Sequence, residues 1–458
     1  MCEQGGFFME EMNFDTLMAL VEKGDFTLLR NELSEMNEVD IAEFLGELDR
    51  DVMIRVYRIL PKDISAEVFS YLESEDQGDI IALISDTEIN KLVDDLFLDD
   101  VVDLVEEVPA NLVTRILRNA SPETRKLINT YLNYPEDSAG SIMTNEMVEL
   151  HDRLTVQEAI DHIRRTGIDK ETIYTCYCID NGRHLKGTID LSDLVFNDKD
   201  ALLREIMDDD KQLIYVNTHD DQEHVAEVVK HYDLLAVPVV DNENRLVGIV
   251  TIDDILDIIE EETEEDFEKM AALLPSEDEY LKTPVLVLVK NRIGWLLVLM
   301  ISATLTGSII QSFEDMLAVI TGLTAAIPII TGTGGNAGNQ SSTLAIRALA
   351  LGEIELKDWF KVLFKEIRVA LICGLVLGAA NFLRMLILHN PGGMEVYITV
   401  SAAMFIAVIM AKMIGCMLPL LAKLVKIDPA VIAGPVISTL VDSLSLLAYF
   451  GLAKAFLI

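Results

Sequence analysis

The sequence has few cysteines, the residues that form disulfide bonds and many structural metal sites. It holds five cysteines in 458 residues, and their spacing forms no metal-binding quartet. Cys176 and Cys178 are separated by a single residue, where a redox pair usually has two between its cysteines. Reduced thiols, as in a cytosolic protein, are therefore the simplest interpretation.

The signatures of ATP-driven pumping and of catalysis are also missing. The sequence contains no Gly-x-x-x-x-Gly-Lys-Ser/Thr loop, which argues against a pump that uses a phosphate-binding loop of this type. No catalytic nucleophile stands out, so we expect no enzyme activity. The first residues, MCEQGGFFMEEMNF, have no basic start and no long apolar core, and we expect no cleaved signal peptide.

Basic residues are scarce in the first part of the chain. Residues 1–280 hold 23 Lys and Arg against 68 Asp and Glu, whereas residues 281–458 hold 13 against 9. So acidic a segment repels nucleic-acid phosphates and favours cations as partners, although an acidic surface that is merely solvated is the alternative. We therefore expect no nucleic-acid partner and a cytoplasmic location for this half.

The acidic half opens with a repeat of about 24 residues, between residues 40 and 134. Each unit has apolar residues at helical spacing, as in Ile41, Phe44 and Leu45, and prolines punctuate the helices. Stacked helical hairpins bury a shared core, which predicts a small superhelical N domain over residues 1–135. Its acids either bind cations or solvate a helix face; they include Asp94, Asp95, Asp99, Asp100 and Asp103.

A second repeat, of about 60 residues, has mixed α/β character. Its first copy carries Gly187–Asp193 where the second carries Gly248–Asp254. Two strand-like runs around a turn at 242–244 predict a β-hairpin, followed by a helix from Asp253. The repeat resembles a pair of CBS modules, expected over residues 136–200 and 201–258.

CBS pairs commonly bind adenine nucleotides through a Gly-x-x-Thr/Ser-x-x-Asp pattern. The resemblance carries this role to Gly248, Thr251 and Asp254 in the second copy. In the first copy Asp190 stands in place of the hydroxyl residue, so ATP is a candidate ligand of the second module alone. An acidic helix over residues 259–280 then leads to the apolar half, either as a solvated spacer or as a link that conveys movement.

Five charge-poor stretches are long enough to span a bilayer, at 283–310, 316–346, 369–388, 396–422 and 430–457. Basic residues cluster on one side of them, which predicts a multi-pass plasma-membrane protein with a cytoplasmic acidic half and an outside C-terminus. Arg384 and Lys412 lie within or near spans and are expected to extend to an interface. The predicted fold is a helical N domain, an α/β CBS pair and an all-α transmembrane domain of five helices.

Two features at membrane depth need explanation. Asp442 is the one carboxylate in the run Val431–Phe450 and is expected roughly midway along its helix, where a charge is costly unless it faces water or a counter-ion. A structural, hydrogen-bonded Asp is the alternative. Residues 328–340, PIITGTGGNAGNQ, predict a span interrupted by glycines that faces an aqueous cavity, with close helix packing through small residues as the alternative.

The segment PIITGTGGNAGNQ, followed by Asp428-Pro-Ala and then by Gly434-Pro, Thr439 and Asp442, resembles the MgtE family of magnesium transporters. The resemblance covers the chain and implies a homodimer in the lipid membrane, with a plug helix over 259–280 and a pore domain over 281–458. It implies a permeation path formed by Asp442, Asn336, Gly434, Pro435 and Thr439. Position 434 is often Asn in the family, and Gly there removes a side-chain oxygen.

The resemblance also implies regulation by bound Mg²⁺. It assigns regulatory sites to acids of the CBS and plug regions, namely Asp221, Glu223, Asp233, Asp254, Asp257, Glu265 and Asp266, and to Asp95 and Asp99 in the N domain. One pore carboxylate per protomer suits Mg²⁺, which keeps most of its waters. The predicted function is a Mg²⁺-selective, channel-like uptake transporter that cytosolic Mg²⁺ closes. A Na⁺- or H⁺-coupled divalent-cation antiporter and a membrane-anchored CBS nucleotide sensor without transport are the alternatives.

Overall fold

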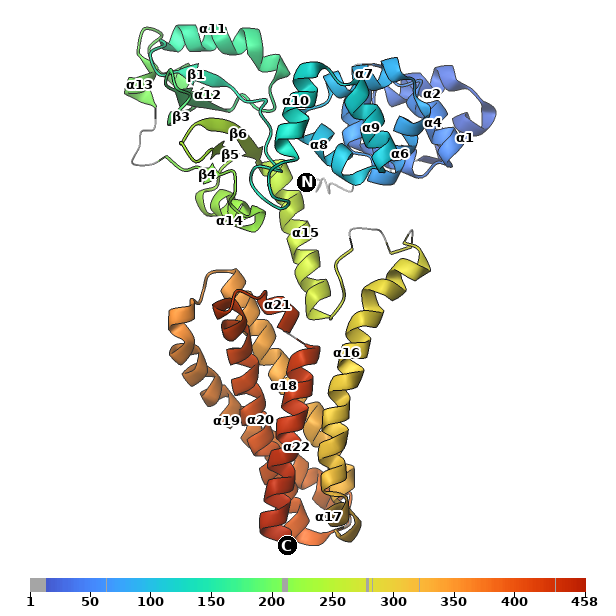
Figure 1. Ribbon diagram of the computed structural model, residues 1–458, viewed down its shortest axis with the longest axis vertical. Helices are drawn as coiled ribbons and strands as arrows, with labels where there is room; N and C mark the ends of the chain where they lie inside the picture. The colour runs from blue at the N-terminus through green and yellow to red at the C-terminus, as the bar shows by residue number, and fades with distance from the viewer. Residues whose placement is uncertain are drawn as a thin grey trace, which may run out of the picture. The chain divides into compact units, whose positions relative to one another are not determined.

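A computed structural model describes residues 14–62, 64–207, 213–276, 280–281, 283–320, 322–432 and 434–458. The chain divides into two compact units, Met1–Ile259 and Glu260–Ile458, each with hydrophobic clusters of its own. In Figure 1 the first unit runs from blue to yellow-green and the second from there to red.

The first unit begins with an array of short amphipathic helices, which confirms the predicted helical N domain. Each helix buries one apolar face, with Phe44, Phe69 and Ile80 fully enclosed in a common core. Several helices begin at a capping residue, as α7 does at Ser85, whose side chain and that of Glu88 form a capping box. The helices are α1 (Phe14–Lys23), α2 (Phe26–Leu33), α3 (Glu38–Gly46), α4 (Arg50–Tyr57), α5 (Ser65–Ser70), α6 (Ser74–Leu83), α7 (Asp86–Asp95), α8 (Leu98–Glu107), α9 (Ala110–Asn119) and α10 (Pro122–Tyr131).

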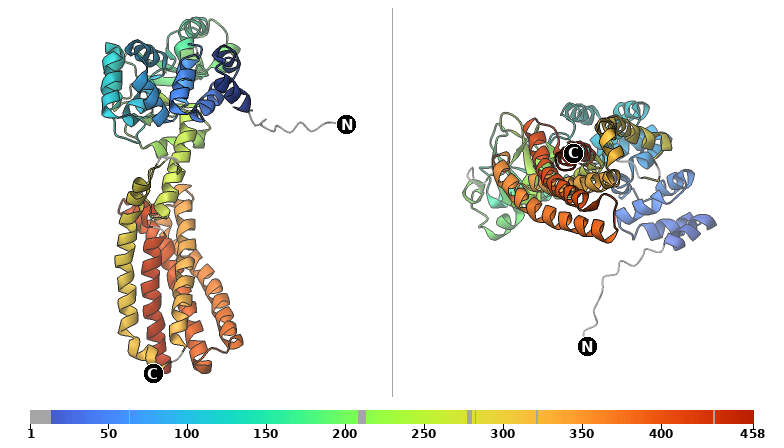
Figure 2. Two further views of the ribbon diagram at one scale, coloured as in Figure 1. Left: turned by 90° about the vertical axis from the view of Figure 1, so that its right-hand side faces the viewer. Right: turned by 90° about the horizontal axis from the view of Figure 1, so that it is seen from below.

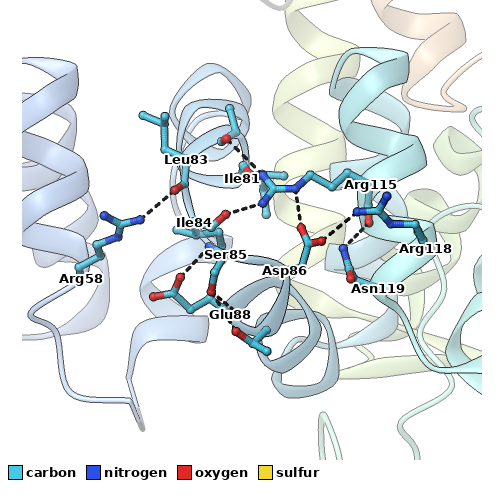
Figure 3. Close-up of polar contacts among 12 residues, drawn as sticks. Arg58, Ile81, Leu83, Ile84, Ser85, Asp86, Glu88, Arg115, Arg118 and Asn119 are labelled. Carbon is cyan, nitrogen blue, oxygen red and sulfur yellow. Dashed lines mark hydrogen bonds and ion pairs between the residues drawn. The ribbon is translucent and has the colours of Figure 1, made fainter.

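Two arginines close the C-terminal end of α6 (Figure 3). Arg115 of α9 donates hydrogen bonds to the carbonyl oxygens of Ile81 and Ile84, at 2.5 and 2.6 Å, and pairs with Asp86 at 2.9 Å. Arg58 donates to the carbonyl oxygen of Leu83 at 2.8 Å. Carbonyl groups in the last turn of a helix have no partner within the helix. The guanidinium groups therefore supply the missing donors and join neighbouring hairpins of the array.

Two three-stranded sheets follow, one in each CBS module, with orders β1-β2-β3 and β4-β5-β6. In each sheet the first pair is parallel and the second antiparallel, so the predicted hairpin is confirmed in β5 and β6. Val237, Val250 and Ile255 of the second module belong to the same buried cluster as the helical array. The elements are β1 (Glu149–His151), α11 (Val156–Thr166), the 3-10 turn η1 (Gly167–Asp169), β2 (Thr175–Ile179), β3 (Leu185–Asp190), α12 (Leu191–Phe196), α13 (Leu203–Ile206), β4 (Val216–Asn217), α14 (Gln222–Tyr232), β5 (Ala236–Val240), β6 (Leu246–Thr251) and α15 (Ile252–Met270).

The second unit is helical, and its long helices lie side by side (Figures 1 and 2). Among the residues that the structure describes, four stretches are long and apolar enough to cross a membrane: Val285–Ser312, Leu356–Ile387, Gly393–Leu424 and Pro429–Leu457. The remaining predicted span corresponds to α18, which has 28 residues but a more polar composition. The elements are α16 (Val285–Ser312), α17 (Glu314–Val319), α18 (Leu323–Ala350), the 3-10 turn η2 (Leu356–Asp358), α19 (Trp359–Ile387), α20 (Gly393–Leu424), α21 (Pro429–Ile432) and α22 (Pro435–Leu457).

Candidate functional site

The glycines of residues 328–340 do not interrupt their helix. α18 is continuous from Leu323 to Ala350, so the predicted break is wrong and the alternative, close helix packing, is correct. A Cβ on Gly338 would lie 3.1 Å from the Ile437 side chain, and one on Gly415 of α20 would lie 2.2 Å from the Gly338 carbonyl oxygen. The small residues therefore let the three helices α18, α20 and α22 approach closely.

Asp442 lies beside one of these glycines. A Cβ on Gly335 would stand 3.7 Å from Asp442 Oδ1, so the missing side chain leaves room for the carboxylate. Asp442 is partly buried, and within the described part of the chain it forms no hydrogen bond or ion pair. It follows Pro435, the first residue of α22, by about two turns, and it lies near the middle of the candidate membrane span Pro429–Leu457, as expected.

The other predicted pore residues lie on two helices: Thr439 precedes Asp442 on α22, and Asn336 lies on α18. Thr439 precedes Asp442 by three residues and so shares its face of the helix, and its hydroxyl donates to the Pro435 carbonyl oxygen at 2.9 Å. Asn336 follows Gly335 and is exposed. Asn339, which the sequence reasoning did not select, donates from its amide to Ser438 Oγ at 3.1 Å. Its position four residues after Gly335 could have placed it on the same packed face.

Gly434 occupies a position that excludes other residues. Its φ is +55°, and a Cβ there would lie 2.6 Å from the carbonyl oxygen of Met270, the last residue of α15. The missing side-chain oxygen at this position therefore has a structural cause: the backbone at the end of α15 occupies the space.

The end of α15 also carries charged contacts within the second unit. Lys269 Nζ lies 2.7 Å from Glu265 Oε1 and 2.9 Å from Asp428 Oδ2. Burial, followed by the Asp428 charge, raises the pKa of Asp266. Burial lowers the pKa of Lys269, but its hydrogen bonds to Glu265 and Asp428 outweigh that effect and raise it overall. The predicted plug acids Glu265 and Asp266 thus meet Asp428 around a lysine that the sequence reasoning missed.

In the first unit, acids of α8 approach the start of α15. Burial raises the pKa of Asp100 and of Asp254 to about 6, and each has further acids nearby, with Asp254 itself acting on Asp100. Burial and these neighbours raise the pKa of Asp99 as well. Glu171, from the first CBS module, has its pKa raised to about 8, first by burial and then by Asp254. Asp99 and Asp254 are therefore brought together as predicted, with Asp100 and Glu171 beside them.

Among the other predicted regulatory acids, Asp257 adjoins this group on α15, and no contact with the group is seen for Asp95, Asp221 or Asp233 in the described part of the chain. Asp95 is exposed and pairs with Lys91 at 3.4 Å. Asp221 caps the N-terminus of α14 by accepting from the Glu223 backbone, whereas Asp233 ends the same helix in the left-handed conformation. Asp257 contributes to the raised pKa of Asp254 on α15. No three His, Cys, Asp or Glu side chains converge into a metal-holding group within the residues that the structure describes.

The predicted nucleotide motif is internally hydrogen-bonded. The Thr251 hydroxyl donates to Asp254 Oδ2 at 2.5 Å, and Thr251 is buried. In the first module Asp190 and Asp193 form a capping box at the start of α12. The two copies thus use the same turn between strand and helix, but only the second has the hydroxyl that the adenine-nucleotide pattern requires.

Lys412 does not extend to an interface as predicted. Only 6% of it is exposed, and its ammonium lies 3.2 Å from Ser341 Oγ and 4.0 Å from Glu366 Oε2. Ser341 Oγ in turn donates to Glu366 Oε2 at 2.8 Å. The lysine is therefore held inside the helix bundle by a partly buried carboxylate, a pairing that could not be predicted because the two residues are far apart in the sequence.

Comparison with known proteins adds three matches to family models and several relatives. The model described as a divalent cation transporter matches residues 327–452, that of the MgtE intracellular N domain residues 36–137, and that of the CBS domain residues 203–261. The magnesium transporter MgtE of Thermus thermophilus is 36% identical over 98% of this chain and 99% of its own length. That of Bacillus subtilis is 31% identical over the same shares.

Solved structures resemble the first unit. The cytosolic domain of the Mg²⁺ channel MgtE in complex with ATP is 36% identical, covering 54% of this chain and 99% of that chain with a TM-score of 0.51. The soluble part of a magnesium transporter is 31% identical, covering 54% of this chain and 97% of that chain with the same TM-score.

Proposed function

Because the chain belongs to the MgtE family of magnesium transporters, we propose that it is a channel-like pathway that takes up Mg²⁺ and that cytosolic Mg²⁺ closes. The observation that carries the proposal is the place of Asp442 in the second unit: a partly buried carboxylate on an apolar helix, beside Gly335 and without a counter-ion among the described residues. A carboxylate in that setting needs a cation or water, and a transported cation supplies the charge it lacks.

The ion passes with its water shell. Mg²⁺ dehydrates reluctantly and is usually held through one or two carboxylates and several waters. We place the pore on the twofold axis of a homodimer, where two Asp442 carboxylates contact a hydrated ion and the Thr439 and Asn336 oxygens border its path.

Substitution of Asp442 tests the pore. In vesicles that contain the purified protein, Asp442→Asn should reduce Mg²⁺ uptake by at least about tenfold, because a neutral amide attracts a divalent cation far less than a carboxylate. Asp315→Asn, in the short helix α17, is the matched control and should leave uptake unchanged. Uptake by Asp442→Asn at the parent rate would contradict the pore assignment. Dependence of uptake on an imposed Na⁺ or H⁺ gradient would indicate the antiporter instead of a channel.

We assign gating to the acids of the first unit and to the end of α15. Asp99, Asp100, Asp254 and Glu171 repel one another when ionised, so divalent cations between them favour a compact arrangement of this unit. The end of α15 lies against Gly434, and Lys269 pairs with Asp428. These contacts support a role for this end of the helix in closing the path next to α22. Asp221, Glu223, Asp233, Asp257, Glu265 and Asp266 supply further cation contacts in this proposal, and Asp95 a weaker one.

Deletion of residues 1–259 separates gating from permeation. We expect current through the parent channel to fall in millimolar cytosolic Mg²⁺, and current through the truncated channel to persist, since unit Glu260–Ile458 keeps the pore and the end of α15. Patch recordings at several Mg²⁺ concentrations measure both. A truncated channel that Mg²⁺ still closes would locate the sensor in the second unit.

The remaining assignments follow from the same proposal. ATP binds the second CBS module at Gly248, Thr251 and Asp254, consistent with the ATP complex of the related cytosolic domain. The protein lies in the plasma membrane with the first unit in the cytoplasm and the C-terminus outside.

A further inference from the structure

One face of α19 is turned away from the other helices of the second unit. Figure 1 shows α19 at the edge of this unit, beside α20. Small residues form the side that meets α20, where a Cβ on Gly374 would lie 3.0 Å from the Phe405 ring. A Cβ on Gly378 would lie 3.1 Å from the Ser401 carbonyl oxygen. The opposite side of α19 carries exposed apolar side chains, and no described residue of the chain covers them.

Basic residues continue this outer face toward the start of the helix. Residues on the face recur every three or four positions, which places them on one side of α19: Lys361, Lys365, Arg368, Ile372 and Leu375. All five are exposed, with Ile372 and Leu375 at 68% and 67%. The outer face therefore changes along the helix from a basic part to an apolar part.

Two of the basic side chains on this face have no acidic partner. Lys361 pairs with Asp358 at 2.6 Å. Across the residues that the structure describes, no carboxylate pairs with Lys365 or Arg368. The carboxylate nearest to them in the sequence, that of Glu366, accepts a hydrogen bond inside the bundle instead. The outer face thus presents two positive charges that are free to meet an anionic group.

Aromatic side chains indicate where this part of α19 lies in a bilayer. Trp359, Phe360 and Phe364 are exposed in the first turns of the helix, and the Arg368 guanidinium lies 5.0 Å from the centroid of the Phe364 ring. Tryptophan and other aromatic side chains gather at the boundary between headgroups and acyl chains. The apolar part of the outer face begins one turn further along, about 6 Å deeper. We therefore expect the basic part at the level of the headgroups and the apolar part among the acyl chains.

We propose that the outer face of α19 binds an anionic phospholipid, with the headgroup phosphate at Lys365 and Arg368 and an acyl chain along Ile372 and Leu375. A guanidinium group binds a phosphate through two parallel hydrogen bonds, and a lysine nearby adds a second charge. A zwitterionic headgroup fits less well, because it brings a positive charge of its own to the same place. The proposal requires that the second unit lies in a bilayer, and it is independent of which ion passes and of how the path closes.

Quenching of a single tryptophan by brominated lipids tests the proposal on the full chain in vesicles. The sequence holds two tryptophans, so Trp295→Phe and Trp359→Phe, combined with Ile372→Trp, leave one reporter on the outer face. In phosphatidylcholine vesicles with about a tenth phosphatidylglycerol, brominated phosphatidylglycerol should quench the reporter at least about threefold more than the same amount of brominated phosphatidylcholine. Equal quenching by the two lipids would overturn the proposal. No quenching by either lipid would also overturn it, because a second copy of the chain or another protein would then cover this face.

Variants in the same reporter background identify the contacts. Lys365→Gln with Arg368→Gln should abolish the preference for phosphatidylglycerol, while quenching by phosphatidylcholine stays at the parent level and shows that the face still lies in lipid. Lys454→Gln is the matched control, since it removes an exposed charge from α22 and should keep the preference. An unchanged preference in the double variant would refute these contacts. Loss of the preference in about 10 mM inorganic phosphate at constant ionic strength would assign the two basic residues to free phosphate and overturn the lipid assignment.

Discussion

At the scale of single residues, the second unit contains a charge pair inside the helix bundle, between the buried Lys412 and the partly buried Glu366. Lys412, Glu366 and Ser341 come from three different helices, α20, α19 and α18, and their polar atoms form one connected group. An ion pair of this kind contributes little net stability, yet removal of one partner leaves an uncompensated charge in a low-dielectric interior. The main role of the group is therefore to determine how the three helices pack together, and its net contribution to stability is small.

Lys412→Met should lower the free energy of unfolding by about 3–5 kcal/mol, because it leaves the Glu366 carboxylate alone inside the bundle. The double variant Lys412→Met with Glu366→Gln should recover most of that loss. Lys454→Met, at an exposed position of α22, should change stability little. Thermal unfolding of the detergent-purified protein gives the comparison. A single variant as stable as the parent would mean that Glu366 does not depend on Lys412 for charge compensation.

At the scale of elements, the helical array depends on guanidinium groups that cap helix ends. Arg115→Met leaves the carbonyl groups of Ile81 and Ile84 without donors, and we expect a loss of about 2–3 kcal/mol in the free energy of unfolding. Arg118→Met is the matched control, since Arg118 is exposed and contacts only Asp86 in this group, which predicts a loss below about 1 kcal/mol. Urea unfolding measures both. Equal losses in the two variants would show that the capping hydrogen bonds of Arg115 contribute no more to the free energy of unfolding than the exposed ion pair of Arg118.

Elements were predictable where local pattern determines them. Helical spacing and capping residues indicate the array, and alternating runs around the turn at 242–244 indicate β5 and β6. The continuity of α18 could not be predicted from the sequence. A glycine-rich segment that lines a cavity and one that packs against a neighbouring helix such as α22 look alike in sequence. Glu171 and Lys269 were missed because each interacts with a residue that is distant in the sequence. Glu171 lies near Asp254, and Lys269 pairs with Asp428.

At the scale of the whole first unit, its buried acids couple stability to pH. The pKa of Asp100 and of Asp254 is raised to about 6 and that of Glu171 to about 8, in each case chiefly by burial. A carboxyl whose pKa is raised on folding holds its proton more tightly in the folded chain than in the unfolded chain. The free energy of unfolding therefore falls as the pH rises from about 4, the usual value for an unfolded carboxyl, through these folded pKa values to about 8.

We therefore expect the full chain in EDTA to melt at a lower temperature at about pH 8 than at about pH 5.5, since each kcal/mol lost lowers the melting temperature of a unit this size by about 2–4 °C. Mg²⁺ at about 10 mM should restore most of the difference at the higher pH and little at the lower, where protons already neutralise the same oxygens. The variant Glu171→Gln, which keeps the shape of the side chain and removes its charge, should shrink the pH effect. Melting temperatures that do not depend on pH in EDTA would mean that these carboxyls are not mutually repelling in the folded protein, and the proposed sensor would lose its driving force.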